Sequence, residues 1–298
     1  MLPEVCPQRN DLLRNSSTSG FVWEQFDFDI CNNFEVGRYT WACISLLCFT
    51  VGFPATLVIL WRMSRMCRGG TVFTPNDLFI LHLTIMDVGF LAFLPIGLLN
   101  HFYLKVWAIE ALWNLVYSLN TLGRPFLMAC VCFDCYLAVV HPIFYHKNKS
   151  LTPRFVAVGV VWTLTAANGL TFFLFYRLFF SFFPAVTYSV PIVIIGVCDG
   201  VIVYKLVKSD PVGKRIHPQK QRAIQTLIYS LAMTAISYLP PVIFLSVGRP
   251  LAGSFNVFVC AIGFPINITS TLGSTFMPVL YLYNVGTLNC ARLRCCKH

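Results

Sequence analysis

Seven long apolar stretches, separated by short polar segments, dominate the pattern of this chain. Each is long enough to cross the hydrocarbon core of a bilayer as a helix, which takes roughly 20 residues. They lie at residues 39–62, 76–102, 108–140, 154–176, 184–208, 220–247 and 254–283. The pattern predicts an all-α fold, a bundle of seven transmembrane helices.

The distribution of lysine and arginine predicts how this bundle is oriented. With the N-terminus outside the cell, 15 of the 22 basic side chains fall in cytosolic segments and six fall outside. Because positive charge is retained on the cytosolic side, this orientation is the consistent one. We therefore expect a multi-pass protein of the plasma membrane, with an extracellular tail (1–38), a transmembrane domain (39–283) and a cytosolic C-terminus (284–298).

The two end segments carry candidate modification sites. Asn15 and Ser17 form a glycosylation sequon on the outer tail, and the first 20 residues contain no apolar core typical of a signal peptide. Residues 284–296 alternate apolar and basic side chains, which predicts a short amphipathic helix along the membrane. Its cysteines are candidate palmitoylation sites, namely Cys290, Cys295 and Cys296.

Composition excludes other classes of protein. The chain is 57% apolar and only 11% charged, whereas soluble domains carry about 25% charged residues. The net charge of +10 comes from basic residues in short loops and forms no continuous face, so no nucleic-acid partner is expected. No cofactor or metal motif occurs, and the chain lacks the paired aspartates or Ser/His dyad of an intramembrane enzyme. We therefore expect no catalytic activity.

Several short motifs, in order along the chain, resemble those of the rhodopsin-like G-protein-coupled receptors. The first span holds Gly52 and Pro54, and the second ends its Leu-His-Leu-Thr-Ile-Met-Asp run at Asp87. The resemblance extends over about 37–296 and is strongest to the purinergic, protease-activated and lipid-receptor branch. It implies activation motifs at Asp134, Cys135, Tyr136, Tyr238, Pro240, Pro278 and Tyr281.

The chain departs from this family at positions that transmit activation in relatives. The arginine of the D/E-R-Y motif is replaced by Cys135, and the Asn or Asp before the last proline is replaced by Met277. The family's cysteine at the outer end of helix three falls at Glu110 by spacing, so the usual extracellular disulfide is missing. A different disulfide is conceivable between Cys260 and either Cys31 or Cys6, provided that the Cα atoms lie within about 7 Å.

Two ionisable residues are predicted near the middle of the membrane, where charges are costly and usually functional. The resemblance places Asp87 where relatives bind sodium, and Arg124 at the helix-three position that assists it. We predict that the Arg124 guanidinium replaces the sodium ion and pairs with the Asp87 carboxylate, because two unpaired charges at that depth would be far less stable.

The resemblance also implies an extracellular ligand cavity between helices three, five, six and seven. Its expected lining is Tyr103, Asn114, Tyr117, Ser118, Tyr238, Val242, Leu245, Arg249 and Thr269. Relatives that bind nucleotides use basic residues where this chain has Val242 and Leu245, so a nucleotide ligand is not favoured. Basic residues at the mouth, such as Arg249, would attract an anionic head group, and an anionic lipid is one candidate ligand.

Two functions remain open at this point. The first is a ligand-sensing receptor that signals through a heterotrimeric G protein. The second is a receptor-shaped protein with weak or absent coupling, which the loss of the arginine at Cys135 favours. A transporter or channel is a third class, but no continuous polar helix face crosses the membrane. Partners in either leading case include membrane lipids and an unknown extracellular ligand.

Overall fold

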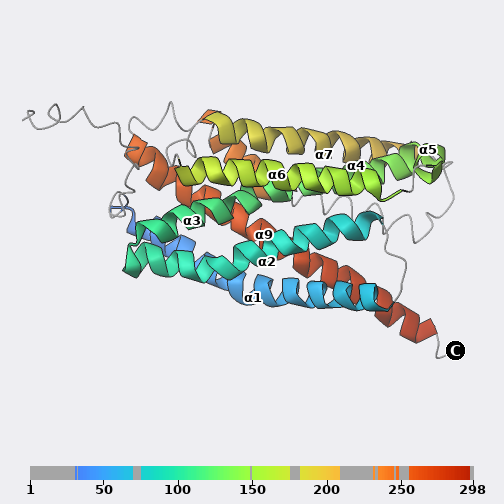
Figure 1. The fold of residues 1–298 in the computed structure, drawn as a ribbon, viewed down its shortest axis with the longest axis horizontal. Helices are drawn as coiled ribbons and strands as arrows, with labels where there is room; N and C mark the ends of the chain where they lie inside the picture. Colours follow the sequence, from blue (N-terminus) through green and yellow to red (C-terminus); the bar gives the residue numbers. More distant parts are fainter. Residues whose placement is uncertain are drawn as a thin grey trace, which may run out of the picture.

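The computed structural model describes residue 31 and residues 33–69, 75–147, 150–174, 182–208, 231, 234–244, 246–247 and 255–295. Its regular elements are helices, and Figure 1 shows them running side by side along the long axis of the molecule. Their bounds are α1 Glu35–Arg68, α2 Pro75–Leu99, η1 Asn100–Leu104, α3 Trp107–Ser118, η2 Leu119–Gly123, α4 Arg124–Val140, α5 Pro142–Lys147, α6 Thr152–Leu174, α7 Phe182–Lys208 and α9 Phe255–Cys295.

The helices correspond to the predicted spans. Within the described residues, five are long and apolar enough to cross a membrane, and they coincide with the first five predicted spans. A shorter apolar helix at Thr234–Phe244 lies in the sixth predicted span, and α9 contains the seventh. The predicted all-α bundle is thus confirmed. Residues 284–295 are helical as expected, but they continue α9 without a break instead of forming a separate helix.

The third span is interrupted in a way that the apolar pattern does not reveal. It is built from α3, the π-helical turn η2 and α4, and Pro125 is the second residue after that turn. A proline inside a helix lacks an N–H group and clashes with the carbonyl four residues earlier. Widening the preceding turn into a π-helix relieves this clash, and such turns are frequent at functional sites. The next residue after η2 is Arg124.

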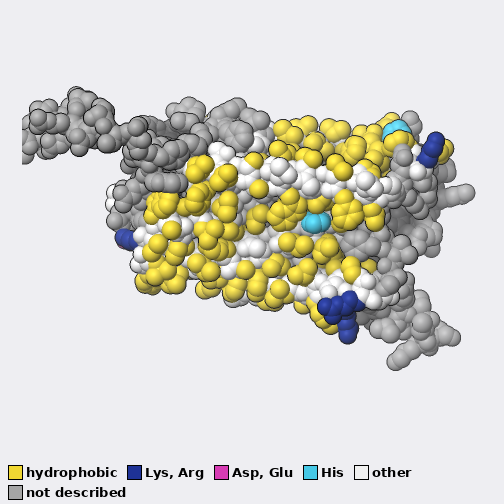
Figure 2. Space-filling model, in the orientation of Figure 1, with side chains coloured by type: hydrophobic (Ala, Val, Ile, Leu, Met, Phe, Trp, Pro, Cys, Tyr) yellow, Lys and Arg dark blue, Asp and Glu magenta, His cyan; other side chains and the backbone are white. Residues whose placement is uncertain are grey.

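The outer surface of the bundle is apolar, and many of its polar side chains are buried inside. Leu47, Trp61 and Val193 are each about 60% exposed, whereas Ser45, Thr56 and Ser274 are fully buried. In Figure 2 apolar side chains cover the visible face, and lysines and arginines appear only toward its two ends. This arrangement is typical of a protein whose surroundings are lipid, because polar side chains are then stabilised by facing one another.

The end of the bundle that is predicted to face outward is held by a disulfide and by two hydrogen bonds of the Asn100 side chain. Cys31 and Cys260 are bonded, with Cα atoms 5.4 Å apart, so the segment before α1 is joined to α9. At the α2–α3 turn, the Asn100 side chain accepts a hydrogen bond from the Val106 N–H at 2.8 Å and donates one to Glu110 at 3.3 Å. Glu110 stands where the resemblance would place a cysteine. It helps to hold this turn through its hydrogen bond with Asn100, without a disulfide.

Candidate functional site

A buried arginine at the centre of the bundle contacts three other helices. Arg124 begins α4 and is only 1% exposed. Its Nε lies 3.0 Å from Oδ1 of Asp87 on α2, so the two residues predicted to meet are brought together. This contact is a salt bridge between two buried charged groups.

The other two nitrogens of the guanidinium hold the remaining helices. Nη1 donates a hydrogen bond to the Tyr238 hydroxyl at 2.8 Å, from the Thr234–Phe244 helix. Nη2 donates to the backbone carbonyl of Gly273 on α9. A planar guanidinium presents its donors in a rigid fork, so one side chain can fix several partners at once. We call Asp87, Arg124, Tyr238 and Gly273 the central cluster.

Gly273 allows the guanidinium to approach the backbone of α9. A Cβ atom at this position would lie 2.6 Å from Arg124 Nη1 and 2.7 Å from Oγ of Ser237. Both distances are shorter than a Cβ atom can approach another heavy atom, so only glycine fits here without a shift of these side chains. One residue further on, Ser274 Oγ donates to the side-chain oxygen of Asn120 at 3.1 Å. Asn120 in η2 and Arg124 directly after it are therefore hydrogen-bonded to two adjacent residues of α9, Ser274 and Gly273.

Buried aromatic residues lie next to the central cluster. Tyr188 on α7 stacks near Tyr238 with ring centroids 6.0 Å apart, and both are essentially unexposed. Tyr117 on α3 packs against Phe90 and Trp113 at centroid distances of 6.0 and 5.9 Å. Three tyrosines from three helices therefore occupy the region where the ligand cavity is expected.

The structure separates the expected lining residues into two groups. Asn114, Tyr117 and Tyr238 are buried within the bundle, and Val242 and Thr269 are partly buried. Tyr103 was predicted wrongly, because it is 80% exposed in η1. Ser118 is buried, and its hydroxyl donates to the carbonyl of Thr165 on α6 at 3.2 Å, so it faces α6. Tyr103 was placed by its position in the family resemblance, and the π-helical turn in which it lies changes which face of the helix a side chain occupies.

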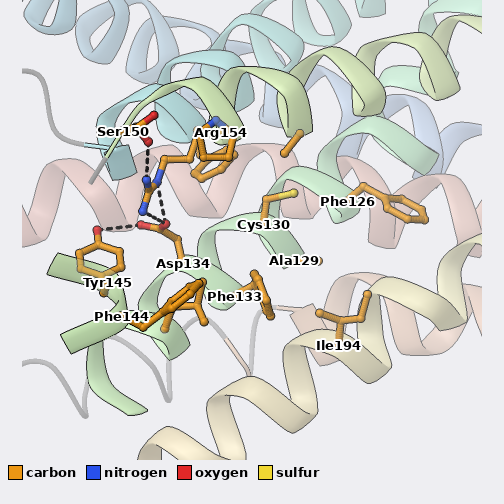
Figure 3. Close-up of a pocket in the computed structure, with 14 residues that line it drawn as sticks. Phe126, Ala129, Cys130, Phe133, Asp134, Phe144, Tyr145, Ser150, Arg154 and Ile194 are labelled. Atoms are coloured by element: carbon orange, nitrogen blue, oxygen red, sulfur yellow. Dashed lines mark hydrogen bonds and ion pairs between the residues drawn. The ribbon is translucent and has the colours of Figure 1, made fainter. Parts of the chain in front are cut away.

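A second aspartate–arginine pair lies at the end of the bundle that is predicted to face the cytosol, and sequence reasoning missed it. Arg154, at the start of α6, contacts Oδ1 of Asp134 through Nη2 at 2.8 Å and Nε at 2.9 Å. The Tyr145 hydroxyl of α5 donates to Oδ2 of Asp134 at 3.0 Å, and Arg154 also donates to the Ser150 carbonyl at 2.7 Å. Figure 3 shows these contacts, which we call the inner cluster.

The inner cluster gives the motif aspartate a partner from another helix. In the D/E-R-Y motif the arginine follows the aspartate directly, and this chain has the half-buried Cys135 there. The third residue of this motif, Tyr136, packs against Phe133 and His141. The predicted activation residues on α9 are also inside the bundle: Pro278 is buried and Tyr281 is partly buried. The available signal for Arg154 was its position, because it is a basic residue at the first position of the fourth predicted span.

The remaining predicted positions lie outside what the structure describes. Asn15, Leu245, Arg249 and Cys296 are not among the described residues. Cys290 and Cys295 are on the helical backbone of α9, but their side chains are not described. Their modification or ligand roles stay predictions.

Taken together, the apolar exterior and buried polar clusters define a multi-pass helical membrane protein. Among known families, the model of "7 transmembrane receptor (rhodopsin family)" matches residues 55–181 of this chain. The resemblance to rhodopsin-like receptors is thus confirmed.

Individual relatives fall in the expected branch. Human chemerin-like receptor 2 is 24% identical over 148 residues, covering 47% of this chain and 40% of the relative. The rat uracil nucleotide/cysteinyl leukotriene receptor is 27% identical over 129 residues, covering 42% and 37%. Human proteinase-activated receptor 3 is 31% identical over 150 residues, covering 48% and 38%. The matched parts therefore amount to about two fifths of each relative.

Proposed function

We propose that this protein is a cell-surface receptor that senses an extracellular ligand and signals through a heterotrimeric G protein. The family match and the named relatives, all of them receptors, support this role. The observation that carries the proposal is the central cluster. Because Arg124 bonds to Tyr238 and to the Gly273 carbonyl, the Thr234–Phe244 helix and α9 cannot move away from α4 without breaking those bonds.

The ligand would bind on the outer side of the central cluster. Asn114, Tyr117, Val242 and Thr269 are the described residues proposed to line that cavity, with Tyr238 at its floor. A ligand that displaced Tyr238 would release one of the bonds of Arg124, which connects binding to helix movement. The apolar residue Val242 favours an apolar or lipid ligand, with an anionic head group held by the basic residues predicted at the mouth.

The same geometry leads us to propose that sodium does not regulate this receptor. The Arg124 guanidinium lies against the Asp87 carboxylate, which is the group that binds sodium in relatives. A cation that is part of the chain cannot dissociate, so the negative charge is compensated at any sodium concentration. Thermal stability measured in sodium and in potassium chloride at equal ionic strength should coincide. A sodium-specific stabilisation that is lost in Asp87→Asn would overturn this point.

A second function is favoured by the inner cluster. Asp134 is engaged by Arg154 and Tyr145, and Cys135 replaces the arginine that meets the G protein in relatives. The chain would then be a receptor-shaped protein that binds its ligand but couples weakly or not at all. Scavenging of a ligand is one such role.

The deciding experiment compares constitutive G-protein activation by the full chain, Cys135→Arg and a control, Cys67→Arg. Cys67 is an exposed free cysteine at the end of α1, so it tests the effect of adding an arginine elsewhere. Surface expression is measured for each variant and used to normalise the signal. Activation by the wild type above mock-transfected cells supports the coupled receptor. Activation by Cys135→Arg alone supports the second function, and no activation by either rejects coupling.

A further inference from the structure

A cavity of about 720 Å³ lies near the inner end of the bundle, away from the expected ligand cavity. Its walls come from α2, α4, α5, α6 and α7, and Figure 3 shows the side chains that line it. Clefts of 300–1,000 Å³ are the usual size for small-molecule sites. Asp134 of the D/E-R-Y position borders this cavity, but neither the motifs nor the family resemblance implies a ligand there.

The cavity exists because α4 and α6 are held apart. α4 packs closely along α7 but makes few contacts with α6. Three of the side chains that line the gap are small, namely Ala129 and Cys130 on α4 and Ala157 on α6. Phe133 and Phe144, which also line it, are 49% and 57% exposed, so the cavity opens on the outer surface of the bundle.

The cavity is elongated and has one polar end. Its lining on α4 runs from Phe126 to Leu137, a rise of about 16 Å along the helix. The Phe126 end is apolar, whereas Asp134, Arg154 and Ser150 lie at the opposite end, next to α5. In a membrane protein, such a gradient follows the direction from the hydrocarbon core to the head-group region.

The polar end carries no net charge. Asp134 and Arg154 are paired with each other at 2.8 Å, so their charges compensate. Ser150 and Tyr145 add neutral hydroxyl groups to the same lining. An anionic head group would therefore have to compete with the Asp134 carboxylate for Arg154, whereas a neutral hydroxyl group can join the hydrogen bonds already present.

We propose that this cavity binds an uncharged, single-chain membrane lipid with a hydroxyl head group, such as a monoacylglycerol. The alkyl chain lies along α4 toward Phe126, and the hydroxyl head lies at Ser150 beside the inner cluster. This second site is independent of the proposed G-protein coupling, because it requires only that the protein folds in a membrane. Its occupant would contact Phe144 and Tyr145 of α5, the helix that follows the D/E-R-Y position.

The test uses the full chain in lipid nanodiscs with a monoacylglycerol that carries a photoreactive group in its chain. Cross-linked peptides are identified by mass spectrometry. Labelling is expected on α4 and α6, and an excess of unlabelled monoacylglycerol should remove it. Ala157→Phe places a ring in the cavity and should lower this labelling about tenfold, which corresponds to about 1.4 kcal/mol.

Val160→Phe is the matched control, because Val160 lies on the same helix, is 53% exposed and is not part of the lining. It should label like the wild type. If Ala157→Phe does not fold, Cys130→Phe fills the cavity from the opposite wall and replaces it. Thermal unfolding of each variant shows whether it is folded.

Three results would overturn the proposal. Equal labelling of Ala157→Phe and Val160→Phe would mean that the probe contacts the bundle only as general surrounding lipid. Stronger competition by a fatty acid of the same chain length would mean that the site prefers an anion. Displacement by a sterol but not by monoacylglycerol would mean that the cavity fits a rigid ring system.

Discussion

The two aspartate–arginine pairs of this protein use the same chemistry in different surroundings. The central pair, Asp87 and Arg124, is 1–3% exposed and joins four helices. The inner pair, Asp134 and Arg154, is 8–9% exposed and joins α4 to the start of α6, with Tyr145 of α5 attached. The two pairs differ chiefly in the helices that they join. The central pair links α2, α4, the Thr234–Phe244 helix and α9, whereas the inner pair links α4 to the start of α6 at one end of the bundle.

Removing Arg124 should have the largest effect. Arg124→Met leaves the Asp87 carboxylate buried without its cation, which should cost about 3–5 kcal/mol and lower surface expression strongly. The double variant Asp87→Leu/Arg124→Met should recover much of this loss, because an apolar pair of similar volume replaces the charges. Thermal unfolding in detergent measures both. If the double variant is as unstable as Arg124→Met, the loss of stability does not come from an unpaired Asp87 carboxylate.

Tyr238→Phe should have the next largest effect. It removes the hydroxyl that accepts the 2.8 Å hydrogen bond from Arg124 but keeps the aromatic packing. A hydrogen bond to a charged group contributes about 1.5–3 kcal/mol. The Thr234–Phe244 helix should then separate more easily from α4, and basal signalling of a coupled receptor should rise. Unchanged stability and unchanged basal signalling would exclude Tyr238 as part of the central restraint.

Arg154→Met should be milder than Arg124→Met. The pair is closer to the membrane surface, and Asp134 keeps its hydrogen bond from Tyr145. We expect a loss of about 1–2 kcal/mol. Limited proteolysis would then show faster cleavage between α4 and α6, while the core of the bundle stays resistant. A loss as large as that of Arg124→Met would contradict the difference between the two pairs.

Tyr145→Phe should have the smallest effect, about 0.5–1.5 kcal/mol for one hydrogen bond. Partial burial, together with the hydrogen bond to Asp134, raises the pKa of Tyr145 above its ordinary value. The phenol therefore stays protonated, and its contribution is complete below pH 10 and lost only as the pH rises through the raised pKa. The difference in thermal stability between wild type and Tyr145→Phe should thus be constant from pH 6 to 9. A difference that varies within this range would mean that another group titrates with Tyr145.

The sequence predicted the bundle well because apolar length is a strong signal for a membrane helix. The meeting of Asp87 and Arg124 was also predictable, since two charges at one depth have few other stable arrangements. By contrast, the inner pair joins residues 20 positions apart on different helices, and the spacing of a linear motif contains no information about that. Tyr103 was misplaced because it lies in the π-helical turn η1, where the helical period changes locally.

The bond between Cys31 and Cys260 gives the molecule a closed covalent path that contains most of the helical bundle. Within that path, any single cleavage of the backbone between the two cysteines leaves one covalent molecule. A protease site inserted between α7 and the Thr234–Phe244 helix would yield two fragments that separate on a gel only after reduction. The chain can therefore be nicked there while its two parts remain stoichiometrically joined, which allows each part to be labelled independently.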